Sequence, residues 1–247
     1  MVEPADCDFY HAFTFPDGSE QPGAWDLRGG EHDYLGHIDL AGRRVLELGP
    51  ASGHLSVTMT AAGAEVVCLE AGFDYSVDLL PRTERDLAAH RSAMMAFTGR
   101  VNNSWWYARR RFGSPAKMVY GSIYEPPADL GTFDHAVFGA ILLHLENPFR
   151  ALWEAARMTT GALVVTEVMA AWPGDPEADA LVRFAPGSDE DMTGWWHFTP
   201  AAVMRMLAVL GFGRAEVSHH RQRHHLGHDL DAPPVEAGMF TVVGHRA

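Results

Sequence analysis

An apolar segment that ends on an acid and runs into a turn of small residues constrains this fold more than any other feature. Residues 44–48 read Arg-Val-Leu-Glu-Leu, and residues 49–53 continue as Gly-Pro-Ala-Ser-Gly. A second apolar segment, residues 65–69, is followed by another acid, Glu70. A strand, a small-residue turn, a helix and a second strand that ends on an acid are typical of a doubly wound α/β domain that binds a nucleoside-bearing cofactor. The small residues let the backbone approach the ligand, and the second acid accepts hydrogen bonds from ribose hydroxyls.

The spacing of the small residues distinguishes between cofactors. A nicotinamide-binding turn has the pattern Gly-x-Gly-x-x-Gly, whose third glycine allows the helix to pack closely on the strand. Counted from Gly49, the third position is Ala51 and the sixth is His54, whose bulk argues against a dinucleotide. The pattern that remains is Glu-x-Gly-x-Ala-x-Gly, which ends at Gly53. A plain strand-turn-helix without a ligand is the alternative interpretation.

This pattern resembles motif I of the class I S-adenosylmethionine (SAM)-dependent methyltransferases, with alanine in place of the middle glycine. The resemblance covers about residues 40–170 and, more loosely, the C-terminal hairpin. It implies SAM as the cofactor, with Glu70 on the ribose hydroxyls, because a carboxylate has paired acceptors that suit a diol. The family usually has an acid near the adenine after the third strand, where this chain has Gly-Ser-Ile-Tyr at residues 121–124. The resemblance also implies that Glu47, Gly49, Ala51 and Gly53 surround the methionine part of SAM. The other residues that it assigns to the cofactor are Pro50, Ser52, Ala71, Gly72, Ser122, Ile123 and Gly139.

The order of the predicted elements is typical of a parallel sheet with helices on both faces. The predicted strands lie at about 44–48, 65–69, 118–120, 133–138 and 162–166, and near 214–220 and 239–243. With the resemblance, this order predicts an α/β fold with a doubly wound, mostly parallel seven-stranded sheet and an antiparallel C-terminal hairpin. We predict an N-terminal cap over residues 1–40 and a SAM-binding methyltransferase domain over residues 41–247, with a lid insertion at about 170–197. Asn147-Pro148 and Thr199-Pro200 predict two helix starts, since Asn caps a helix and Pro suits its first position.

The residues after the fourth strand, 139–145, lie where substrate and cofactor meet in the family, and His144 there is the first candidate for a general base. A structural histidine beneath the cofactor is the alternative. His11, in an aromatic N-terminal segment, is the second candidate. Much of the rate of methyl transfer can come from proximity, so a base helps without being obligatory. The candidate substrate contacts, two of them in a predicted wall at residues 103–107, are Tyr10, Trp105, Trp106, Trp196 and His197, with core packing as the alternative for each.

The composition of the chain limits the kinds of partner that it is expected to bind. The net charge of −13 argues against a nucleic-acid-binding surface, which needs a basic face. Residues 219–228 are rich in histidine, but arginines interleave with them and no cysteine completes a site, so we predict a solvated loop and no metal. No apolar stretch approaches the ~20 residues that span a bilayer, and no secretory signal is evident. We therefore expect a cytoplasmic protein with a small-molecule substrate and neither a nucleic acid nor a membrane as partner.

The sequence thus predicts SAM-dependent methyl transfer to an oxygen or nitrogen of a small molecule. Abundant alanine and a single lysine, Lys117, suggest a GC-rich bacterial genome and favour bacterial secondary metabolism. A non-methylating reaction, a carboxymethyl transfer and a non-catalytic binding protein of the same fold stay open as alternatives. The carboxymethyl alternative rests on residues 9–13 and 195–198, which resemble a subgroup that includes the tRNA wobble-uridine carboxymethyltransferases. The oligomeric state is not predicted.

Overall fold

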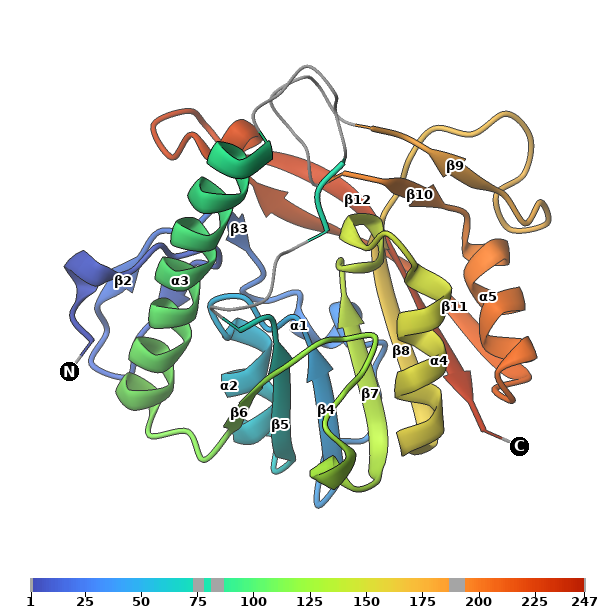
Figure 1. The fold of residues 1–247 in the computed structure, drawn as a ribbon, viewed down its shortest axis with the longest axis horizontal. Helices are drawn as coiled ribbons and strands as arrows, with labels where there is room; N and C mark the ends of the chain where they lie inside the picture. Colours follow the sequence, from blue (N-terminus) through green and yellow to red (C-terminus); the bar gives the residue numbers. More distant parts are fainter. Residues whose placement is uncertain (1, 73–77, 81–86, 187–193, 247) are drawn as a thin grey trace.

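The apolar segments of the sequence pair side by side in one central sheet (Figure 1). The computed structural model describes residues 2–72, 78–80, 87–186 and 194–246. The strands of the central sheet are β3 (Trp25–Asp26), β4 (Arg44–Leu48), β5 (Glu65–Glu70), β6 (Lys117–Tyr120), β7 (Phe133–Gly139), β8 (Thr159–Val168), β11 (Arg214–His224) and β12 (Val235–His245). They lie in the order β3-β11-β12-β8-β7-β4-β5-β6.

The pairing of these strands confirms the predicted fold class. β6, β5, β4, β7 and β8 run parallel to one another, whereas β12 is antiparallel to both β8 and β11. Parallel strands covered on both faces read as continuous apolar runs, and in β4 both Val45 and Leu46 are fully buried although they face opposite sides. The C-terminal hairpin therefore closes one side of a parallel sheet.

The sheet is one strand wider than the seven strands predicted. β3, from the N-terminal segment, pairs with β11 through Trp25↔His224 and Asp26↔Arg223. A strand of two residues is too short to show apolar alternation, so only the tertiary contact reveals it. The N-terminal segment also forms a small hairpin of β1 (Phe13–Thr14) and β2 (Glu20–Gln21).

Helices cover both faces of the sheet (Figure 1). α1 (Glu31–Tyr34), α2 (His54–Ala61) and α3 (Leu87–Phe112) lie on one face, and α4 (Pro148–Met158) and α5 (Pro200–Val209) on the other. Both predicted helix starts are confirmed. The side chain of Asn147 accepts a hydrogen bond from the backbone N–H of Arg150 at 3.1 Å, and that of Thr199 accepts one from Ala202 at 3.2 Å.

The structure shows the secondary structure of two segments for which the sequence predicted only a position, the wall and the lid. Residues 103–107, predicted as a wall on the substrate side, belong to the long helix α3. The predicted lid holds the antiparallel pair β9 (Val182–Phe184) and β10 (Trp196–Phe198), while its residues 187–193 lie outside the described part of the chain. Within the described residues, none of the helices has the length and apolar character needed to cross a bilayer.

Candidate cofactor site

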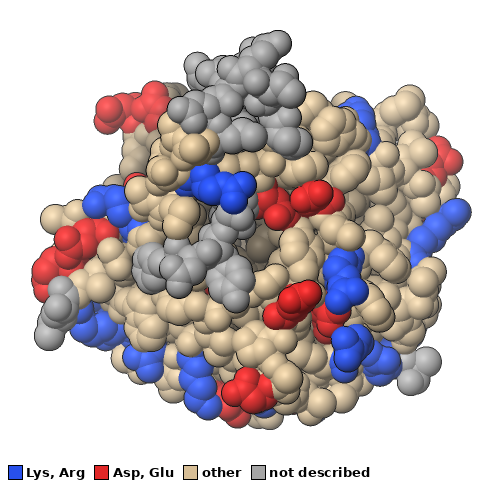
Figure 2. Space-filling model, viewed as in Figure 1, with Lys and Arg blue, Asp and Glu red and all other residues tan. Residues whose placement is uncertain are grey.

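The turn between β4 and α2 lies at the carboxyl ends of the parallel strands, where ligands bind in doubly wound folds and where Figure 2 shows a hollow in the surface. Gly49 and Gly53 have φ angles of +67° and +87°. A Cβ atom at Gly49 would lie 2.2 Å from Cδ1 of Ile141, and one at Gly53 would lie 2.5 Å from Cδ1 of Trp105. Ala51, with φ +48°, adopts the same left-handed conformation at a cost of roughly 1 kcal/mol. The turn is thus packed tightly between two large side chains, which fixes its backbone.

Glu70 joins the ends of β4 and β5. Its carboxylate accepts the backbone N–H of Ala71 at 2.8 Å and also receives the backbone N–H of Ala51 in the turn. Burial raises the pKa of Glu70 to about 7, although both N–H groups favour the charged form. The acid that the sequence assigned to the ribose hydroxyls therefore lies beside the turn.

Glu47 is placed differently from the expectation that it surrounds the methionine part of SAM. It is 3% exposed, and its carboxylate accepts hydrogen bonds from Ser56 Oγ in α2 and from Cys68 Sγ at 3.3 Å in β5. The Trp105 indole N–H donates to the same Ser56 hydroxyl at 3.0 Å. Glu47 thus supports the turn from below, in the core, and burial raises its pKa to about 7.

On the predicted adenine side, Ser122 and Ile123 follow β6. The Ser122 hydroxyl accepts the backbone N–H of Tyr124 at 3.1 Å, and Ile123 packs against the core. Asn102, on α3, was missed by the sequence analysis. It is 1% exposed and donates from Nδ2 to the backbone oxygen of Ala71 at 3.5 Å, while its Oδ1 is buried without a hydrogen-bond partner. A lone Asn in a long helix carries no sequence signal, so only the fold brings it beside the loop that follows Glu70.

The end of β7 is enclosed by residues from three other elements. A Cβ atom at Gly139 would lie 3.2 Å from Cε1 of Tyr34, which belongs to α1. Glu167, at the end of β8 and 2% exposed, accepts the backbone N–H of Leu142 at 2.8 Å, and burial raises its pKa to about 8. It thereby holds the 3-10 turn Leu142–His144, which ends on the candidate base. An acid directly after a buried strand was the signal that could have assigned Glu167.

The structure brings His11 onto the turn. Its backbone N–H donates to Ser52 Oγ at 2.7 Å, and its ring Nδ1 lies 3.2 Å from the same oxygen. Burial, with a smaller effect of His54, lowers the pKa of His11 to about 3. A general base works best with a pKa near the working pH, so this environment does not suit His11 to the role of base that the sequence suggested. His144 stays the candidate.

The predicted substrate contacts separate into two groups. Tyr10 stacks edge-on against His11, with ring centroids 5.2 Å apart, and burial raises its pKa to about 12. Trp196 donates its indole N–H to Leu145 O at 2.9 Å, which places it and His197 in β10 against the segment that carries His144.

The two tryptophans of α3 lie apart from the other predicted substrate contacts. Trp105 is 1% exposed and packs under Gly53, so it is a core residue of the turn and not a wall of the acceptor site. Trp106 is 38% exposed and donates its indole N–H to the Tyr120 hydroxyl at 2.9 Å. Successive residues of a helix point in different directions, so the two indole rings have different surroundings.

Asp78 connects the loops at the carboxyl edge and was not singled out in the sequence. Its carboxylate accepts the Tyr124 hydroxyl and, at 2.7 Å, the backbone N–H of Glu146. Its backbone oxygen accepts the Trp195 indole N–H at 3.3 Å. Asp78 therefore links the segments that follow β5, β6 and β7 with the residue that precedes β10.

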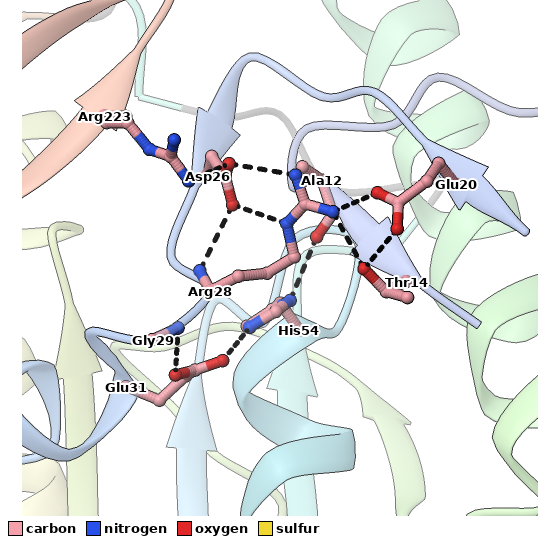
Figure 3. Close-up of polar contacts among 9 residues, drawn as sticks. All are labelled: Ala12, Thr14, Glu20, Asp26, Arg28, Gly29, Glu31, His54 and Arg223. Atoms are coloured by element: carbon pink, nitrogen blue, oxygen red, sulfur yellow. Dashed lines mark hydrogen bonds and ion pairs between the residues drawn. The ribbon is translucent and has the colours of Figure 1, made fainter. Parts of the chain in front are cut away.

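Polar contacts attach the N-terminal segment to this edge (Figure 3). The Arg28 guanidinium donates to Asp26 at 2.7 Å and also reaches Glu20, while Arg223 of β11 donates to the other oxygen of Asp26 at 2.7 Å. His54, the first residue of α2, lies between Ala12 O at 3.0 Å and Glu31 Oε1 at 2.9 Å. The segment that carries Tyr10 and His11 is thus fixed to α2 and to the hairpin.

The three buried acids give the ligand-free protein an unusual pH dependence. The pKa values of Glu47, Glu70 and Glu167 are raised to about 7, 7 and 8, so the folded state holds protons that the unfolded state releases. The lowered pKa of His11, about 3, makes the free energy of unfolding rise with pH instead. This opposite effect falls mainly below pH 6.5, the pKa of an unfolded histidine. Between pH 6.5 and 8 we therefore expect the free energy of unfolding to fall by about 2 kcal/mol.

Urea unfolding at constant ionic strength measures this fall. The Glu167→Gln variant, which stays neutral and still offers an oxygen to the backbone of Leu142, is expected to show a clearly smaller fall. A wild-type stability that is constant or rises over this window contradicts the expectation.

Comparison with known proteins finds no match to the sequence but several solved structures with a similar fold. No family model and no curated protein matches the chain. The 1,6-didemethyltoxoflavin-N1-methyltransferase of Burkholderia thailandensis, solved with its substrate and S-adenosylhomocysteine (SAH), is 13% identical, with a TM-score of 0.55 over 90% of this chain and 78% of its own. The N-terminal domain of EvdMO1, solved with SAH and D-fucose, is 18% identical, with a TM-score of 0.56 over 100% of this chain and 93% of its own.

The magnesium protoporphyrin IX methyltransferase (ChlM) of Synechocystis, solved with SAH, is 12% identical, with a TM-score of 0.50 over 86% of this chain and 78% of its own. Similarity at this level establishes the fold, while substrates are set by sites that vary on one fold. The chain has the fold of the class I SAM-dependent methyltransferases.

Proposed function

We propose that the protein transfers a methyl group from SAM to an oxygen or nitrogen atom of a small molecule, in bacterial secondary metabolism. The observation that carries the proposal is the bridge that the Glu70 carboxylate makes between the ends of β4 and β5, directly beside the glycine turn. A carboxylate and a glycine turn at this edge suit a ribose and the chain attached to it.

The residues present fit SAM. The turn at residues 49–53 is held in place by Ile141 and Trp105, and the partly buried carboxylate of Glu70 lies beside it. A ligand that carries positive charge, as a sulfonium does, would favour the charged form of Glu70 and Glu167 at this edge, whose pKa values burial raises. When bound, SAM supplies an electrophilic methyl group on sulfur.

This chain's own residues would hold the acceptor. The backbone turn that ends on His144 is fixed by Glu167 on one side and by Trp196 through Leu145 on the other. A fixed turn of this kind can orient an acceptor, and we propose His144 as the group that removes its proton. Tyr10, Trp196 and His197 are the proposed acceptor contacts.

The experiment that tests the proposal combines binding with product mass. Titration calorimetry with SAM and with SAH is expected to show binding, and incubation with SAM and a panel of hydroxylated and amino small molecules is expected to yield SAH and a product heavier by one methyl group. A gain of carboxymethyl size supports the carboxymethyl alternative. Absence of binding to either ligand by the folded protein overturns the proposal.

A further inference from the structure

The His11 side chain is held on the turn between β4 and α2 by polar contacts in addition to packing. Both its backbone N–H and its ring Nδ1 contact one hydroxyl, that of Ser52, and the residue is 8% exposed. Its backbone is also fixed from the other side, because a Cβ atom at Gly23 would lie only 2.2 Å from the His11 carbonyl carbon. The ring therefore has one defined place, against the turn between β4 and α2.

The hydrogen bonds of Ser52 favour one tautomer of the neutral His11 ring. The Ser52 oxygen already accepts the backbone N–H of His11, so its own hydrogen is available to the nearby Nδ1. Nδ1 then accepts, and the ring proton of the neutral imidazole sits on Nε2. No described residue forms a hydrogen bond with Nε2. Nε2 is also not among the described side-chain atoms that are buried without a partner, so its N–H is accessible to a ligand.

The surroundings of Nε2 favour an anion. The His54 ring lies 6.1 Å from the His11 ring, and both of its nitrogens face oxygens that accept, Ala12 O and Glu31 Oε1. With both of its nitrogens engaged, the His54 ring offers no acceptor to Nε2 of His11. His54 is also the first residue of α2, and the N-terminus of a helix carries partial positive charge.

We propose that His11 binds the α-carboxylate of the methionine part of SAM through its Nε2–H. This inference rests on the proposed function and extends it. The α-carboxylate is the one anionic group of SAM, and the turn that carries Ser52 is where the resemblance places the methionine part. The donor is a neutral ring, so it can recognise the carboxylate without adding a cation beside the sulfonium. His11 thus becomes a binding residue for the cofactor in place of a base.

Two ligands that differ only in the amino-acid part test the proposal. SAH carries the α-carboxylate, whereas 5′-methylthioadenosine keeps the adenosine and the sulfur and lacks the amino-acid part. His11→Gln retains an N–H donor near the position of Nε2, and His11→Met has a similar length without a donor. We expect His11→Met to bind SAH about 10- to 100-fold more weakly than His11→Gln, because a hydrogen bond to a charged group is lost. Both variants should bind 5′-methylthioadenosine with the same affinity, which also shows that they fold.

The outcomes distinguish a failure of the proposed function from a failure of the role proposed for His11. Wild-type protein that binds neither ligand overturns the proposed function. Wild-type binding of SAH together with equal SAH affinities in the Gln and Met variants overturns only the role of His11, as does a parallel loss for both ligands. The exposed His32, replaced by leucine, is the control for a histidine outside the site and should leave both affinities unchanged.

Discussion

Replacing Gly53 with alanine is expected to lower the free energy of unfolding by about 3 kcal/mol and to remove binding of SAM and SAH. The φ angle of +87° imposes a left-handed backbone that costs an L-residue about 1–2 kcal/mol. The new Cβ would also lie 2.5 Å from Cδ1 of Trp105. That indole cannot move aside easily, because it is 1% exposed and donates to Ser56. Forcing extra volume into such a core costs typically 1–3 kcal/mol.

Urea unfolding monitored by circular dichroism measures the change in stability, and calorimetry with SAH measures the binding. Ala51→Gly is the matched control, since it alters the same turn in the opposite sense. Relief of the left-handed strain at Ala51 is offset by the greater freedom of glycine in the unfolded chain, so this variant should stay within about 1 kcal/mol of wild type and keep its affinity. If Gly53→Ala is as stable as Ala51→Gly, the packing argument for the turn is wrong.

Replacing Glu70 with alanine is expected to weaken SAH binding by at least about 100-fold, with a smaller effect on stability. The carboxylate is the acceptor proposed for the ribose hydroxyls, and each hydrogen bond to a charged group contributes about 1.5–3 kcal/mol. Glu70→Gln keeps one acceptor oxygen and should lose less affinity than the alanine variant. Calorimetry with SAH gives the three dissociation constants.

The control for this variant lies on the same strand. Glu65 begins β5, at the opposite edge of the sheet, and its carboxylate forms an exposed ion pair with Lys117 at 2.9 Å. Exposed pairs contribute little, so Glu65→Ala should bind SAH like wild type and unfold at nearly the same urea concentration. Equal affinities for the Glu65 and Glu70 variants would exclude Glu70 from the cofactor site.

Local patterns in the sequence predicted much of the fold because the relevant forces are local. The apolar run at residues 44–48, the caps at Asn147 and Thr199 and the glycine turn each depend on neighbouring residues, and the structure has the predicted strand, helix starts and turn there. The acid at the end of the second strand was identified in the same way, from its place directly after an apolar segment.

Side-chain direction was less accessible to the sequence. Trp105 and Trp106 are adjacent in the sequence, yet one ring supports the turn and the other lies half exposed on α3. Glu47 and Glu70 both lie at strand ends, yet Glu47 turns into the core toward Ser56 while Glu70 reaches the backbone of the turn. The residue types are the same within each pair, and the role of each side chain depends on which neighbours the assembled fold places in the direction in which it points.

The sequence by itself determined the layered α/β fold and the position of the cofactor turn, since strand periodicity, caps and small residues act over a few residues. Only the tertiary structure decided that β3 joins the central sheet, that Asp78 links loops distant in the sequence, and that His11 lies on Ser52. Each of these contacts joins residues far apart along the chain. Their formation depends on burial and hydrogen bonding that exist only once the sheet has assembled, so no local pattern could specify them.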